Sequence, residues 1–506
     1  TEWHDAWATF CSGEKSWALN QDQLSTTHPI VAPINDLNDT YVNFDGITYA
    51  KGASVLKQLV YYVGREKFFQ GINQYLNKYA YSNATLADLL HELEKASGRD
   101  LKAWSAKWLE ESGINTIATE VEENADGTIA SLTLNQTAPA EHPVLRPHRL
   151  AVGFYDEDPA TGKIVRTDRF ELDVDGKSTV VAAAAGKKRP AFILVNDDDL
   201  TYTFALANLQ HFDDALARAV VWLSLWDMTR DGDLAAEKFI DTTLALLATE
   251  TESTTFRYAL SCMSTTAWHY TAPDRRADVV KHVAKELWKL VIAAPGGSDQ
   301  QFQLVTAYLG YGEEGDAEFA EHAQGLFDGS LIVVGLEIDN NFTWTIINAL
   351  SSVKLIDQAG IDAQLAKRDT TENREFALGA HAVRGDAAAK EWAWNEALNN
   401  ADLTNMQLEA VARGFGATPR PDLAEPYAAK YYDVVDWVWK NKSFHMAEAL
   451  LEGLYPYYAD PATLVELGHR WLADHEDADN ALKRIVRGNV ESSQRTLKVR
   501  DFNAAL

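Results

Sequence analysis

The hydrophobic pattern of the chain changes twice, and these changes limit the folds that it can adopt. Up to about residue 115, apolar residues recur every three or four positions, as in amphipathic helices. From about Thr116 the chain alternates with a two-residue period in short β-branched segments, with turn signals such as Asp126-Gly127 between them. From about Thr203 the spacing is helical again. The sequence therefore predicts three parts, at 1–115, 116–202 and 203–506.

The first part contains a loop that leads into an amphipathic helix between Phe44 and Gly64. From Gly52 onward an apolar stripe is predicted, formed by Ala53, Leu56, Leu59, Val60 and Val63. Gly64 can end this helix. Tyr49 then lies at or just before the first turn, where its phenol could point into a cleft and donate a hydrogen bond to a developing oxyanion. Residue chemistry alone favours a packing role for such a tyrosine, because aromatic side chains commonly fill cores.

The second part is predicted to be a small β-sandwich that spaces two helical blocks. Its strands are expected at Ile129 to Leu134, Leu150 to Tyr155, Ile164 to Leu172 and Phe192 to Val195. The acidic run Asp197 to Asp199 follows, but it lacks the glycine and the terminal glutamate of a calcium loop. A solvated domain junction is therefore the favoured interpretation of this run.

The third part is predicted to be an irregular α-solenoid of the HEAT or armadillo type. Helices of about ten to eighteen residues are joined by short loops with glycine and proline breaks, without a sharp repeat period. Such a stack usually leaves a concave face, which could wall a substrate chamber or hold a partner. An aromatic cluster could line that face, although helical spacing favours core packing; it comprises Tyr427, Tyr431, Tyr432, Trp437 and Trp439.

Composition excludes several classes of function. The 506 residues carry a net charge of −28, which repels nucleic acid and anionic lipid. The two cysteines, Cys11 and Cys262, make a disulfide framework or a cysteine metal site implausible and favour a reducing compartment. No apolar run of about 18 residues indicates a membrane span, and no signal sequence is visible. We therefore predict a cytoplasmic protein, and a chain that begins at Thr1 in helical pattern suggests a piece of a longer one.

Several motifs resemble one enzyme family. The run Ile47-Thr48-Tyr49-Ala50-Lys51-Gly52-Ala53-Ser54-Val55-Leu56 resembles the segment that carries the catalytic tyrosine in zinc aminopeptidases of the aminopeptidase N family, which are gluzincins. Ser25-Thr26-Thr27-His28-Pro29-Ile30 is similar to the family's Ser-x-x-His-Pro-Ile element. Asn196 to Tyr202 and Trp226 to Arg230 look like its actinobacterial branch. The likeness extends over nearly the whole chain.

The resemblance implies that residues 1–115 are the helical end of a thermolysin-like catalytic domain. It also implies zinc as the cofactor of the full-length enzyme, peptides with a free N-terminus as substrates, and a role for Tyr49 in holding the oxyanion of the tetrahedral intermediate.

The family's zinc ligands are missing from the sequence. His91-Glu92 is followed by Lys95 where His-Glu-x-x-His needs its second histidine, and His475-Glu476 is followed by Asp479. The family's Gly-x-Met-Glu-Asn strand has no counterpart. We therefore predict no metal-ligating or cofactor-binding residue in this chain, and expect the ligands and the general base to precede Thr1.

Two interpretations remain open. The chain is either the C-terminal portion of a metallo-aminopeptidase, inactive by itself and partnered by the N-terminal part of the same protein, or a non-catalytic scaffold of the same architecture that binds a peptide or a protein. An intact motif around Tyr49 and the absence of a start methionine favour the first interpretation.

Overall fold

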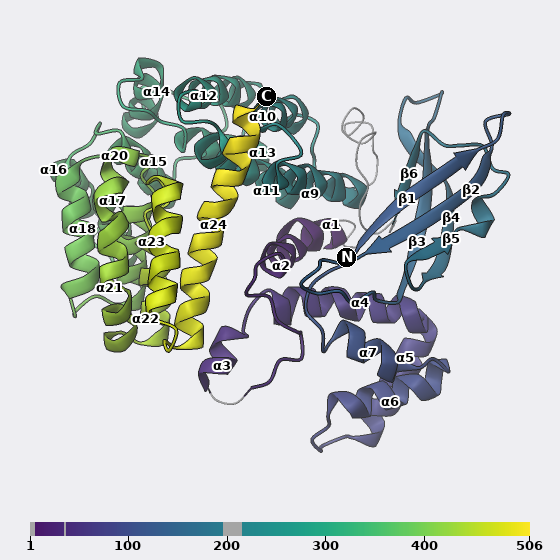
Figure 1. Cartoon of the computed structure of the whole chain (residues 1–506). Helices are drawn as coiled ribbons and strands as arrows, with labels where there is room; N and C mark the ends of the chain where they lie inside the picture. The colour runs from purple at the N-terminus through teal and green to yellow at the C-terminus, as the bar shows by residue number, and fades with distance from the viewer. Residues whose placement is uncertain (1–5, 35–36, 196–214, 506) are drawn as a thin grey trace. The chain divides into compact units, whose positions relative to one another are not determined.

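The computed structural model describes residues 6–34, 37–195 and 215–505, which form a mostly helical protein with two small antiparallel sheets (Figure 1). Two compact units are distinguished, Thr1–Leu225 and Trp226–Leu506. The predicted boundary at 202, the motif Asn196 to Tyr202 and the acidic run Asp197 to Asp199 lie outside the described residues.

The first unit begins with short helices that lead into a small helical core. Its elements are α1 (Ala6–Phe10), η1 (Cys11–Lys15), α2 (Ser16–Asp22), α3 (Leu37–Val42), η2 (Ile47–Lys51), α4 (Gly52–Val63), α5 (Arg65–Lys78), α6 (Leu86–Ser97) and α7 (Leu101–Trp108). Gly64 ends α4 with φ +86°, Thr85 and Asp88 form a capping box at the start of α6, and Gly98 closes that helix with φ +73°.

The buried face of α4 differs from the predicted stripe. Val55, Leu59 and Val63 pack with residues of α6 and α7, whereas Leu56 is half exposed and Ala53 lies at the surface. The prediction was wrong for these two residues because α4 has apolar side chains on more than one face. Packing against α6 and α7, and not periodicity alone, selects the face that is buried.

Six strands follow, in two antiparallel sheets. They are β1 (Thr116–Glu123), β2 (Ile129–Thr137), β3 (His148–Glu157), β4 (Ile164–Val174), β5 (Ser178–Val180) and β6 (Phe192–Val195). The strand orders are β1-β2-β5 and β4-β3-β6. Leu132 and Leu134 of one sheet share a hydrophobic core with Val152 and Phe154 of the other. The four strands expected from sequence are confirmed.

The second unit is helical. Its elements, with α9 (Ala215–Asp231) at its start, are α10 (Ala236–Leu247), α11 (Ser253–Thr265), η5 (Thr266–Tyr270), α12 (Arg276–Ala293), α13 (Asp299–Leu309), α14 (Ala317–Asp328), α15 (Asn340–Ser352), α16 (Gln358–Lys367), α17 (Thr371–Ala382), α18 (Ala387–Asn399), α19 (Asn405–Gly416), α20 (Pro421–Ala424), η6 (Glu425–Tyr427), α21 (Ala428–Asn441), α22 (Phe444–Gly453), α23 (Pro461–Asp474) and α24 (Asn480–Ala504).

Alternate helices of this unit pack against one another in succession, in the order α11, α13, α15, α17, α19 and α22. The long helix α24, yellow in Figure 1, packs against α22, α23 and η5. Of the predicted aromatic cluster, Tyr427, Tyr431 and Tyr432 are buried in the core, whereas Trp437 is 43% exposed. Among the described residues, no helix has both the length and the hydropathy needed to cross a membrane.

Glycines allow α17, α19 and α22 to approach closely. A Cβ atom on Gly414 of α19 would lie 2.6 Å from the carbonyl oxygen of Gly379 and 2.8 Å from Cβ of Ala382, both in α17. A Cβ atom on Gly453 of α22 would lie 2.8 Å from Cβ of Ala412 in α19. These separations are shorter than van der Waals contact, so a larger residue would force the helices apart.

We therefore expect Gly414→Ala to lower the free energy of unfolding by about 1–3 kcal/mol through overpacking. Gly488→Ala is the matched control, since Gly488 also lies within a helix but a Cβ there would meet nothing within 4 Å. The control should raise stability by about 0.5–1 kcal/mol through helix propensity. Chemical denaturation followed by circular dichroism measures both, and equal effects of the same sign would contradict the packing argument.

Candidate active-site tyrosine and a buried lysine

Tyr49 lies in a π-helical turn, η2, that continues into α4. The backbone N–H of Lys51 donates to the carbonyl of Gly46 over 2.8 Å, and that of Gly52 donates to Ile47, each five residues back. The sequence predicted an ordinary first turn here, and periodicity carries no signal for the wider one. Single π turns are rare and frequently occur at functional sites.

The side chain of Tyr49 is 47% exposed, so within the described residues it is not part of a packed core. Its ring contacts Phe44 edge to face, with 4.5 Å between ring centroids and an interplanar angle of 68°. Phe44 is itself 65% exposed. The phenol therefore lies at the surface of the first unit, where its ring contacts that of Phe44.

The Asp45 carboxylate fixes the start of the π turn. Its Oδ1 accepts the backbone N–H groups of Ile47 and Thr48 over 2.9 and 3.0 Å. Its Oδ2 lies 3.0 Å from Nε2 of His28, whose Nδ1 lies 2.7 Å from the carbonyl oxygen of Pro29. The structure thus brings the His28-Pro29 element and the Tyr49 segment together. Sequence reasoning missed Asp45, although an aspartate two residues before an uncapped turn is a recognisable signal.

A buried ion pair holds the end of the turn. Nζ of Lys51 lies 2.7 Å from Oδ2 of Asp22 and donates to the carbonyl of Gly113 over 3.1 Å. The hydroxyl of Thr27 donates to Oδ1 of the same Asp22 over 2.6 Å. Burial lowers the pKa of Lys51, and Asp22 opposes that shift. Because Lys51 directly follows Ala50 in η2, this pair anchors the backbone beside Tyr49.

The described residues do not supply a metal site. Within 6–34, 37–195 and 215–505 there is no group of three or more His, Cys, Asp or Glu side chains that could hold a metal ion. Of the two half-motifs noted in the sequence, His475 instead bonds Asp436 through Nε2 at 2.9 Å and Trp471 through Nδ1. The residues that the structure describes therefore do not fit a zinc ion.

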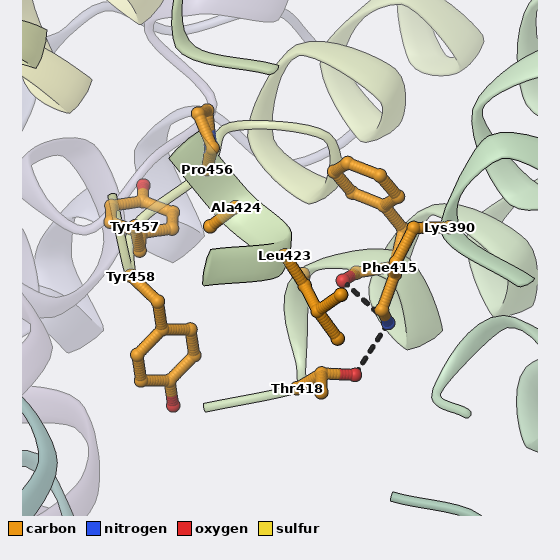
Figure 2. Close-up of a pocket in the computed structure, with 9 residues that line it drawn as sticks. Lys390, Phe415, Thr418, Leu423, Ala424, Pro456, Tyr457 and Tyr458 are labelled. Carbon is orange, nitrogen blue, oxygen red and sulfur yellow. Dashed lines mark hydrogen bonds between the residues drawn. The ribbon is translucent and has the colours of Figure 1, made fainter. Parts of the chain in front are cut away.

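A second candidate is a small pocket in the helical unit, where the Lys390 side chain lies beside Leu423 and points toward Thr418 (Figure 2). Lys390 is 2% exposed. Its Nζ donates to the carbonyls of Ala382 over 2.7 Å and Phe415 over 3.1 Å, and to the Thr418 hydroxyl. Burial lowers the pKa of Lys390 to about 7, which Asp386 opposes.

A lysine with such a pKa can serve as a base or a nucleophile. Here, however, its donors are occupied by oxygens at the C-terminal ends of α17 and α19, where the helix dipole favours a cation. We interpret Lys390 as a clamp between these helices. No sequence signal distinguishes it from a surface lysine of α18.

The lowered pKa of Lys390 predicts a pH dependence of stability. Between about pH 7 and the unfolded lysine pKa of about 10.4, the unfolded chain binds a proton that the folded chain lacks, so this residue makes stability rise with pH. We expect Lys390→Met to reduce that rise when thermal unfolding is compared at pH 7, 8 and 9. Lys440→Met, at an exposed position of α21, is the control for loss of a charge. An unchanged slope in Lys390→Met would contradict the prediction.

Comparison with known proteins finds two protein-family domains in this chain. The Peptidase family M1 domain matches residues 1–108, which include Tyr49, and the ERAP1-like C-terminal domain matches residues 190–495. Aminopeptidase N of Streptomyces lividans is 38% identical over 521 aligned residues, which cover 100% of this chain and 60% of that protein.

Two archaeal aminopeptidases match a shorter part of the chain. Probable aminopeptidase 2 of Sulfurisphaera tokodaii is 42% identical over 120 residues, 24% of this chain and 15% of that protein. Leucyl aminopeptidase of Saccharolobus solfataricus is 39% identical over 115 residues, 23% of this chain and 15% of that protein. The chain thus covers less than two thirds of the length of each of these relatives. By the two domains that it matches and its likeness to the Streptomyces protein, the chain belongs to the aminopeptidase N family of peptidase family M1.

Proposed function

We propose that this chain contributes the oxyanion-binding tyrosine to a metallo-aminopeptidase that removes N-terminal residues from peptides. The observation that carries the proposal is the exposed phenol of Tyr49 on a π turn anchored by Asp45 and Lys51. That turn lies within the part matched by the Peptidase family M1 domain, and the relatives above are named aminopeptidases.

Tyr49 acts as a hydrogen-bond donor. When a peptide bond is attacked, its carbonyl oxygen gains negative charge, and a positioned O–H group stabilises that charge more in the transition state than in the substrate. The anchoring by Asp45 keeps the donor in place before the substrate arrives, which avoids reorganisation during the reaction. Tyr49 needs no change of protonation state for this role.

We also propose that the zinc ligands and the general base lie outside this sequence. The absence of a His-Glu-x-x-His segment supports this part of the proposal, as does the 60% coverage of the Streptomyces protein. Residues 1–115 would be the helical end of the catalytic domain, 116–202 a β-sandwich and 203–506 an α-solenoid, in a cytoplasmic enzyme. Zinc would be the cofactor of the whole protein and not of this chain.

Exposed apolar side chains support the N-terminal part of the same protein as a partner. Val31, Ile34, Leu37, Tyr41 and Phe44, which precede Tyr49 in the chain, are each at least 45% exposed. Large apolar side chains exposed in one segment of the chain are the kind of surface that an interaction partner covers. A catalytic-domain portion that covers them would place its own residues close to the Tyr49 phenol.

A non-catalytic scaffold is the second candidate. The loop between α14 and α15 exposes Ile332 by 81% and Val334 by 80%, and a protein or peptide could dock on these side chains. Activity of the full-length protein separates the two proposals.

We expect Tyr49→Phe, in the full-length protein encoded by the reading frame, to lower kcat by about 10²–10³, the usual effect of losing one oxyanion donor. KM and zinc content should stay nearly unchanged, because the phenol neither binds the ground state nor holds the metal. Hydrolysis of an aminoacyl anilide measures the rate. Tyr81→Phe, at a fully exposed tyrosine, is the control, and near-normal turnover of Tyr49→Phe would rule out the assignment.

The chain of 506 residues by itself should bind no stoichiometric zinc and release no amino acid from the same anilide. Mixing it with a separately produced N-terminal portion should restore release. Metal analysis and the anilide assay test both statements, and metal-dependent release by the chain alone would show that it contains a site of its own.

A further inference from the structure

Two arginines of the helical unit lie in one region, and no carboxylate in the described part of the chain pairs with either. Arg276 is the first residue of α12 and Arg500 lies near the end of α24, and both helices pack against η5. Nε of Arg500 donates to the carbonyl oxygen of His269 in η5 over 2.7 Å. Nε of Arg276 is buried, and no group within residues 6–34, 37–195 and 215–505 forms a hydrogen bond with it. Among the described residues, neither guanidinium forms an ion pair.

Tyr458 completes this cluster. Its ring stacks on that of His269 with 4.7 Å between centroids and 23° between planes. Tyr458 also lines the pocket of Lys390 (Figure 2). Each guanidinium has five N–H donors, so the two arginines have ten in all. Of these ten, only the N–H of Arg500 Nε donates to a described protein group.

Because the chain has a net charge of −28, it is unusual that no described carboxylate pairs with Arg276 or Arg500. The neighbouring Arg275, for example, pairs with Glu237 at 2.6 Å. An orphaned buried donor destabilises a fold, and two nearby guanidinium groups add like-charge repulsion. An anion between them would remove both penalties.

The electrostatics agree with the geometry. Burial, and then Arg276, lowers the pKa of Arg500 to about 10, while Asp460 opposes the shift. Burial lowers the pKa of His269 to about 4, and Arg500 and Arg276 add to that shift. Burial raises the pKa of Tyr458 to about 12. Near neutral pH the cluster therefore holds two cations, a neutral imidazole and a phenol that can donate.

We propose that Arg276 and Arg500 bind a small oxyanion, a carboxylate or a phosphate, with the Tyr458 hydroxyl as a neighbouring donor. The planar fork of a guanidinium matches two oxygens of such a group. Arg276 also opens a helix of 18 residues whose N-cap residue, Arg275, makes no side-chain capping bond, so the first N–H groups of α12 favour an anion at the same end. This site is independent of the Tyr49 proposal.

The test uses the whole chain and titrates inorganic phosphate or acetate by calorimetry at constant ionic strength in chloride. We expect binding of at least one of the two, and a Kd raised about tenfold or more in Arg276→Gln and in Arg500→Gln, since a hydrogen bond to a charged group is typically worth that much. Arg275→Gln, at the adjacent paired arginine, is the matched control and should bind as the wild type does.

Phosphate binding alone would identify a tetrahedral ligand, and acetate binding alone a carboxylate. Arg276→Lys keeps the charge but loses the fork, so its affinity should fall between those of the wild type and Arg276→Gln. The proposal is overturned if neither anion binds beyond chloride, or if both glutamine variants bind as the wild type does while circular dichroism shows them folded.

Discussion

The position of Tyr49 depends on the carboxylate of Asp45. This side chain is buried, and its two oxygens serve two different segments: Oδ1 accepts the first N–H groups of η2, and Oδ2 bonds His28 from the preceding loop. A π turn is less favourable than an α turn and needs support from outside its own backbone. Asp45 provides that support at the start of the turn, and the Lys51–Asp22 pair provides it at the end.

Two buried cations of this protein, Arg146 and Lys390, donate mainly to backbone carbonyls. Arg146, 1% exposed, donates to the carbonyls of Lys107, Glu111 and Ser112 at and after the end of α7. Lys390 does the same at the ends of α17 and α19. Carbonyls at helix C-termini carry partial negative charge and cannot be protonated, so such clamps persist at acidic pH, where a carboxylate partner would be lost. Arg276 has no such partner, which separates it from these structural cations.

Local signals predicted the elements of this fold better than its contacts. The Thr85–Asp88 capping box, Gly64 and Gly98 were recognisable because each acts within a few residues of itself. The buried face of α4 was not, because Leu56 and Val55 are equally apolar and only the packing against α6 and α7 distinguishes them. Tyr49 was found through its motif. Asp22 pairs with Lys51, 29 residues away, and Lys390 bonds groups 8 to 28 residues away, so neither leaves a local pattern in the sequence.

The environment of Tyr49 also extends beyond the helices of its own segment. Gln58 of α4 accepts the backbone N–H of Arg149 at the start of β3 over 2.9 Å, so the helix that continues from the π turn is bonded to the sheet region. Arg146 lies just before the same strand and ties it to the end of α7, while Lys51 bonds Gly113 in the connection to β1. Segments at and beside the strands therefore bond to Lys51 and to the helix that continues from the π turn, while Asp45 bonds the start of the turn. The exposed Tyr49 phenol is thus carried on a backbone that is held at both the start and the end of η2.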